Sequence, residues 1–166
     1  MRPIFIALFL AAFLNGSVQA ANVVADPFPP ARFTSLYLER DEGGANIVIQ
    51  LNGDTVTYTK TVKGQVVETK TVQPAGDDWF QFIQGLNQAK VYKWAPHYEY
   101  PGQGVTWVIE LAMPDRKFSS DGMNEFPKEN AEDQPQADPN AGPSVPFQFF
   151  WQAALGLVGK AAATAK

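Results

Sequence analysis

The stretch IVIQLNGDTVTYT, residues 47–59, decides the fold class. Ile47, Ile49 and Leu51 alternate with Val48 and Gln50, which is the period-2 pattern of a half-buried strand. Asn52-Gly53 follows this run and precedes a second one. An Asn-Gly pair between two such runs is the strongest short-range hairpin signal, because a type I′ turn needs positive φ at both central residues. We therefore expect two antiparallel strands joined by a tight turn at Asn52-Gly53.

The same alternation continues on both sides of this hairpin. Leu36 and Leu38 alternate with Tyr37 and Glu39 upstream. Downstream, Lys63-Gly64 predicts a second turn that leads into Val66 to Val72. The sequence thus predicts a four-stranded antiparallel meander with one threonine-rich, wetter face.

Two segments have helical rather than strand spacing. After Pro74-Ala75-Gly76, either Asp77 or Asp78 is placed to cap a helix. The apolar stripe of that helix is Trp79, Phe82, Ile83 and Leu86, and a second stripe near the end of the chain is Phe147, Phe150, Trp151, Ala154, Leu155 and Val158. Gly159 is a plausible stop for the second helix.

A β-hairpin is expected between the two helices. Trp107, Ile109 and Leu111 alternate with Val108 and Glu110, and Pro114-Asp115 predicts a turn into Arg116 to Ser119. Strands followed by a helix, a hairpin and a helix do not have the regular alternation of a parallel sheet. The predicted class is α+β: an antiparallel meander sheet followed by a helix, a β-hairpin and a C-terminal helix packed on one face.

The first 20 residues are typical of an export signal. Arg2 gives a positive start, Ile4 to Leu14 form an apolar run too short to span a bilayer, and Val18-Gln19-Ala20 resembles a cleavage site. The alternative is an uncleaved membrane anchor, but the apolar run is interrupted by Asn15, Gly16, Ser17 and Gln19 before it is long enough to span a bilayer. We expect cleavage after Ala20 and a periplasmic or secreted protein without a membrane anchor. The expected organisation is a signal peptide (1–20), an extended proline-rich lead-in (21–31), a single domain (32–159) and a tail (160–166).

Composition excludes several classes of function. The chain of 166 residues has no cysteine, so it has neither disulfides nor thiolate chemistry. Its formal net charge is -4, and no basic patch is visible. It therefore has no electrostatic reason to bind nucleic acid or an anionic membrane. We predict no cofactor, and the composition leaves the oligomeric state open.

From Trp79 to Val158 the chain resembles a loosely defined set of small exported bacterial α+β proteins of unknown function. The resemblance rests on the first helical stripe, on Gly104 to Ile109 entering a strand, on Gly122 to Pro127, and on the closing helix with Phe147, Phe150 and Ala154. Such proteins commonly have Asp-Gly where this chain has Gln103-Gly104, and they lack the segment Lys128 to Val145. The resemblance implies a fold and an exported location, and no reaction.

The catalytic resources are few. His97 is the only histidine, and we expect it in a loop with a structural or incidental role. The chain has no Gly-x-Ser-x-Gly elbow, no His-Glu-x-x-His pair and no phosphate-binding glycine loop. No sequence feature supports a triad of His97 with Ser119 or Ser120. Carboxylates such as Glu99, Glu110 and Asp121 remain candidates for general acid-base work.

Two segments are candidate binding surfaces. Aromatic residues interleave with prolines from Tyr92 to Pro101, and such side chains either anchor interfaces or cover the junction between helix and sheet. Residues 121–138 hold six acids against one lysine, and residues 128–145 read as a mobile acidic insertion that is either solvated or recognises a basic partner. The acidic spacing fits a calcium loop poorly, and no metal site is predicted. The candidate binding residues are Trp94, His97, Tyr98, Tyr100, Asp121, Glu125, Glu129, Glu132 and Asp133.

These observations favour a noncatalytic binding module for another envelope or exported protein, of inhibitor, immunity or accessory type. A carboxylate-dependent envelope hydrolase is one alternative. A small-ligand carrier is another, and it predicts an apolar pocket between the sheet and the helices.

Overall fold

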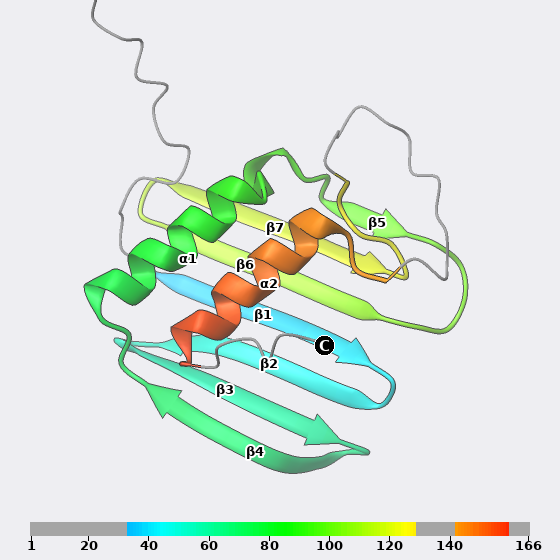
Figure 1. The fold of residues 1–166 in the computed structure, drawn as a ribbon, viewed down its shortest axis with the longest axis horizontal. Coiled ribbons are helices and arrows are strands. Elements are labelled where there is room, and N and C mark those ends of the chain that lie inside the picture. The colour runs from blue at the N-terminus through cyan, green and yellow to red at the C-terminus, as the bar shows by residue number, and fades with distance from the viewer. Residues whose placement is uncertain (1–32, 129–141, 160–166) are drawn as a thin grey trace, which may run out of the picture.

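The fold consists of one twisted sheet and two helices, seen in a computed structural model that describes residues 33–128 and 142–159 (Figure 1). The predicted signal peptide, the lead-in, residues 129–141 of the acidic insertion and the tail lie outside the described residues. In chain order the elements are β1 (Ser35–Glu42), β2 (Ala45–Asn52), β3 (Thr55–Val62), β4 (Gln65–Val72), α1 (Gly76–Gln88), a short 3-10 helix (Val91–Lys93), β5 (His97–Glu99), β6 (Thr106–Met113), β7 (Arg116–Met123) and α2 (Val145–Leu157).

The seven strands form one mixed sheet in the order β4-β3-β2-β1-β6-β7-β5. Strands β1 to β4 pair consecutively and antiparallel, and β1 also pairs with β6, which joins the later hairpin to the same sheet. The α+β class is confirmed. The expectation of a wholly antiparallel sheet was wrong, because β5 pairs parallel with β7. A three-residue strand is too short to show alternation in the sequence.

Of the two predicted tight turns in the meander, one lies at the predicted residues and the other is displaced by one residue. Lys63 and Gly64 have φ of 50° and 77°, and they form the two-residue turn between β3 and β4 as predicted. The preceding turn is displaced by one residue: Asn52 pairs with Thr55, so Gly53-Asp54 forms the turn. Gly53 has φ of 64°, whereas Asp54 has no positive φ. This pattern has glycine at the first central position, as in a type II′ turn, rather than the predicted type I′ turn at Asn52-Gly53.

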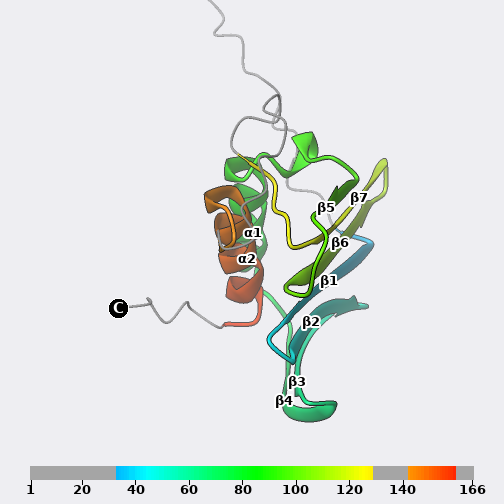
Figure 2. The same ribbon diagram turned by 90° about the vertical axis from the view of Figure 1, so that its right-hand side faces the viewer.

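Both helices lie on the same face of the sheet (Figure 2). The N-cap of α1 is Ala75, not Asp77 or Asp78. Asp78 instead occupies the third helical position and accepts a hydrogen bond of 2.7 Å from the Ala75 backbone N–H. The N-cap of α2 is Ser144, whose Oγ accepts a hydrogen bond of 3.4 Å from the Phe147 N–H. Val145, the last residue of the predicted insertion, is the first residue of α2.

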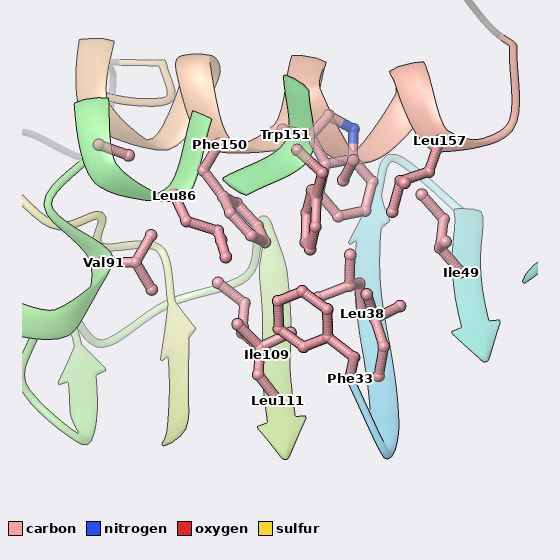
Figure 3. Packing of buried hydrophobic residues seen from close by; sticks show 14 of the residues in the cluster. Phe33, Leu38, Ile49, Leu86, Val91, Ile109, Leu111, Phe150, Trp151 and Leu157 are labelled. Atoms are coloured by element: carbon pink, nitrogen blue, oxygen red, sulfur yellow. The ribbon is translucent and has the colours of Figure 1, made fainter. Parts of the chain in front are cut away.

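The core lies between the helices and the sheet (Figure 3). Leu86 of α1 and Phe150 and Trp151 of α2 point toward apolar side chains of β1, β2 and β6. Phe82 and Ile83 of α1 belong to the same buried cluster. The close approach of the helices depends on Gly85, since a Cβ at that position would lie 2.2 Å from the Ala153 Cβ. The buried sheet residues include Leu36, Leu38, Ile49, Ile109 and Leu111.

Candidate functional site

The sheet face opposite the helices forms the candidate site (Figure 2). Leu38 and Ile109 are buried beneath the helices, so the residues that alternate with them point to the opposite face. Cross-strand partners share a face, and one row runs from Glu39 of β1 through Val108 of β6 and Asp121 of β7 to His97 of β5. We call the outward side chains of these four strands the open face.

The open face is acidic. Its cations are Lys117 of β7 and, when protonated, His97. Five carboxylates belong to it: Glu39 and Asp41 of β1, Glu99 of β5, Glu110 of β6 and Asp121 of β7. Because they lie on paired strands, their positions are set by the sheet rather than by loops.

Two hydrogen bonds hold Glu39 in place on β1, at one side of this face. Tyr37 donates its hydroxyl to Glu39 Oε2 at 2.6 Å, and Asn46 of β2 donates Nδ2 to Oε1 at 2.5 Å. The hydrogen bond to Glu39 raises the pKa of Tyr37 to about 12, with smaller contributions from burial and from the charges of Glu39 and Glu110. Tyr37 therefore remains a neutral donor throughout the physiological range.

His97 lies between two carboxylates. Its Nδ1 is 2.6 Å from Asp121 Oδ2 and its Nε2 is 3.4 Å from Glu99 Oε2. Both hydrogen bonds raise the pKa of His97, and the bond to Asp121 has the larger effect. The expected loop position was wrong, because His97 begins β5 and its backbone is fixed by the pairing with Asp121.

The imidazole is not part of a serine triad. Both of its ring nitrogens face carboxylates, as the two distances show. Ser120 is buried on the helix side, where its hydroxyl donates to the Ala95 carbonyl at 2.7 Å. Ser119 is exposed on the open face and pairs across strands with Glu110. Neither serine is placed as a nucleophile activated by His97.

The contact between His97 and Asp121 predicts a pH dependence. Replacing Asp121 with asparagine is expected to lower the pKa of His97, because the strongest interaction that favours the imidazolium is lost. The chain has one histidine, so an NMR titration of the ring resonances measures this directly. In the wild type the stabilisation by this pair is present below pH about 6.5 and is lost as the pH rises through the raised pKa. An unchanged titration midpoint in Asp121→Asn would mean that the contact does not form.

The predicted aromatic surface is divided between the core and the edge of the fold. Trp94 is only 8% exposed; its indole N–H donates to the Ala89 carbonyl at 2.9 Å, and its ring stacks on Phe147. Tyr98 is half-buried on the helix side and its hydroxyl accepts the Ala95 N–H at 2.8 Å. Burial is the main cause of its raised pKa. Tyr100 is half-buried and its backbone N–H donates to the Met123 carbonyl. The structure thus places Trp94 and Tyr98 at the junction between helix and sheet.

Of the acidic candidates, the structure describes Asp121 and Glu125, and it places them in different surroundings. Asp121 belongs to the open face, whereas Glu125 is 6% exposed and its Oε1 has no hydrogen-bond partner among the described residues. The Glu125 backbone carbonyl accepts the Trp107 indole N–H at 2.8 Å. Glu129, Glu132 and Asp133 lie outside the described residues. Sequence alternation indicated that Tyr37 and Glu39 share a face, but the pairing of β1 with β6 that completes the open face had no sequence signal.

Two clefts lie away from the open face. The first, of about 370 Å³, lies at the start of α1 and is lined by Phe33, Leu51, Pro74, Trp79, Phe80 and Ile83 among others. The second, of about 260 Å³, is lined by residues 101–105 together with Glu42, Asn124, Phe126, Gly142 and Pro143. Glu99, Glu110 and Asp121 line neither cleft.

The sequence motifs behind the family resemblance serve the fold. Asn124 has φ of 56° and donates Nδ2 to the carbonyls of Tyr100 and Gly102 at 3.2 and 3.0 Å. A Cβ on Gly104 would lie 1.9 Å from Asn124 Oδ1, so another residue there would displace the Asn124 side chain. These contacts fix the 101–105 loop against the end of β7. The resemblance itself stays a prediction.

No protein-family model and no curated protein matches the chain. Within residues 33–128 and 142–159, no three or more His, Asp or Glu side chains are arranged to hold a metal ion. In the same ranges, neither helix has the length and apolar character that crossing a membrane requires.

Proposed function

We propose that this chain is a noncatalytic exported module that binds another envelope or exported protein through the open face of its sheet. The observation that carries the proposal is the charge of this face, on which five carboxylates accompany Lys117 and His97. The partner surface that complements it is basic. Complementary charge speeds encounter and suppresses wrong partners.

The fixed orientation of two acidic side chains supports a binding role. Glu39 is oriented by Tyr37 and Asn46, and Asp121 is oriented by His97. Carboxylates held in place lose less side-chain freedom when a partner docks, so more of the interaction energy contributes to affinity. The proposed site also includes His97 and Asp121 from the residues that the sequence singled out.

A hydrolase is less well supported. Glycoside hydrolysis needs two carboxyl groups that flank a bond held between them. Glu99, Glu110 and Asp121 instead project from an open sheet surface and line neither cleft. A small-ligand carrier is the second candidate, favoured by the apolar cleft at the start of α1, whose volume of about 370 Å³ is in the range of ligand sites.

A pair of matched charge reversals tests the proposal. Glu99→Lys with Glu110→Lys reverses two exposed acids of the open face. Asp54→Lys with Asp77→Lys makes the same change in net charge, in the β2–β3 turn and in the first turn of α1. Each immobilised protein is incubated with a soluble envelope extract. The protein used is recovered from the periplasm, and N-terminal sequencing is expected to show that it begins at Ala21.

We expect the wild type and the control variant to retain a basic protein. The open-face variant should retain at least about tenfold less of that protein, since like charges across an interface cost several kcal/mol. Retention should also weaken as salt is raised. Equal retention by all three proteins, or loss in the control variant alone, would contradict the assignment of the open face.

A further inference from the structure

Strand β4 forms one edge of the sheet. Within the described residues β4 pairs only with β3, whereas β5 at the opposite edge has three residues. An edge strand presents unpaired backbone N–H and C=O groups that another strand can extend. Val66 and Val67 on β4 are large hydrophobic side chains that are 63% and 58% exposed.

The charges of β4 are self-complementary. Glu68 and Lys70 precede and follow Thr69 near the middle of β4. Their side chains therefore point to one face of the sheet, and that of Thr69 points to the other. If two β4 strands run antiparallel with Thr69 opposite Thr69, Glu68 of each copy lies opposite Lys70 of the other. Such a two-fold contact uses the same patch on both chains, and opposite charges on facing positions stabilise strand pairs.

Two features that commonly protect edge strands do not block this contact. A lysine on an edge repels a second copy, but in this register Lys70 faces a glutamate. A bulge twists an edge away from pairing, and β4 has its register shift near the hairpin turn, opposite Lys60 and Thr61. Residues 68–72 keep a regular register with β3 and remain available as a straight template.

We propose that two copies of this chain associate through antiparallel pairing of their β4 strands, centred on Thr69, into one continuous sheet. The contact leaves the strands of the open face, β1, β6, β7 and β5, unchanged. The proposal is therefore independent of the proposed partner binding.

Sedimentation velocity over a range of concentrations of the whole mature protein tests this. We expect a concentration-dependent dimer. Glu68→Lys or Lys70→Glu alone places like charges opposite each other twice per dimer and is expected to raise the dissociation constant about tenfold. The double swap, Glu68→Lys with Lys70→Glu, restores opposite pairs and is expected to restore the dimer.

Circular dichroism and unfolding midpoints show that each variant is folded, which matters because Glu68 also pairs across strands with Lys60. If one single variant does not fold, the other gives the same comparison. A protein that stays monomeric at every concentration, or a dimer that both single reversals leave unchanged, would overturn the proposal.

Discussion

Replacing Trp107 with alanine is expected to lower the free energy of unfolding by about 3 to 5 kcal/mol, the range for a large aromatic residue removed from a packed core. Trp107 is 1% exposed, and its ring contacts those of Trp94, Tyr98, Phe126 and Phe147. It connects the last strands, the start of α2 and the segment after β7. The alanine variant therefore loses contacts in three parts of the fold at once.

Urea unfolding followed by circular dichroism measures this loss. Phe149→Ala is the matched control, since Phe149 is an aromatic residue of α2 that is 44% exposed, and we expect it to cost no more than about 1 kcal/mol. Equal losses in the two variants would show that the ring cluster around Trp107 is not the centre of the core.

Gly122→Ala is expected to lower the free energy of unfolding by about 1 to 3 kcal/mol, although it adds a single methyl group. Gly122 lies on β7 between Trp107 of β6 and Tyr98 of β5. An added Cβ would lie 2.5 Å from Cε2 and Nε1 of the indole, closer than packed atoms allow. The indole cannot easily move, because its N–H is bound to the Glu125 carbonyl and its ring is enclosed by others.

Gly156→Ala is the control for this substitution. Gly156 lies in α2, and a Cβ at that position meets nothing within 4 Å. Alanine is the better helix former, so this variant is expected to gain about 0.5 to 1 kcal/mol. Denaturant midpoints of the two variants should move in opposite directions. If Gly122→Ala were as stable as the wild type, the packing of Trp107 against β7 would be wrong.

Local patterns in the sequence predicted the elements well. Alternation identified β1, β2, β3 and β6, and the apolar stripes identified both helices, because each depends on neighbours within a few residues. The predictions were wrong where the conformation of a single residue determines the position of a turn or of a helix cap. The turn moved from Asn52-Gly53 to Gly53-Asp54, since only the pairing of Asn52 with Thr55 fixes its position. An acidic residue near the start of a helix can be the N-cap itself, or it can accept the N-cap backbone N–H from the third helical position. Asp78 does the second, and the sequence pattern does not distinguish the two.

The candidate site depended on contacts between distant segments, which periodicity does not reveal. The pairing of β1 with β6 and of β5 with β7 brings Glu39, Asp121 and His97 onto one row. The aromatic residues near Pro96 suit an exposed surface and a buried junction equally well in sequence. Only the fold shows that the Trp94 ring packs between Trp107 and Phe150. Arg40 likewise faces the helices, where its guanidinium lies 5.9 Å from the ring centres of Phe147 and Trp151.

Site-specific photo-crosslinking in the envelope of the producing cell tests the central claim most directly. A photoreactive residue replaces Ser119 on the open face in one protein and Gln84, exposed on α1, in another. The account predicts a discrete adduct with a basic protein from position 119 and none from position 84. It also predicts that Glu99→Lys with Glu110→Lys removes the adduct, whereas Asp54→Lys with Asp77→Lys leaves it. An adduct from position 84 alone, no adduct from position 119, or an adduct indifferent to the open-face reversal would contradict the account.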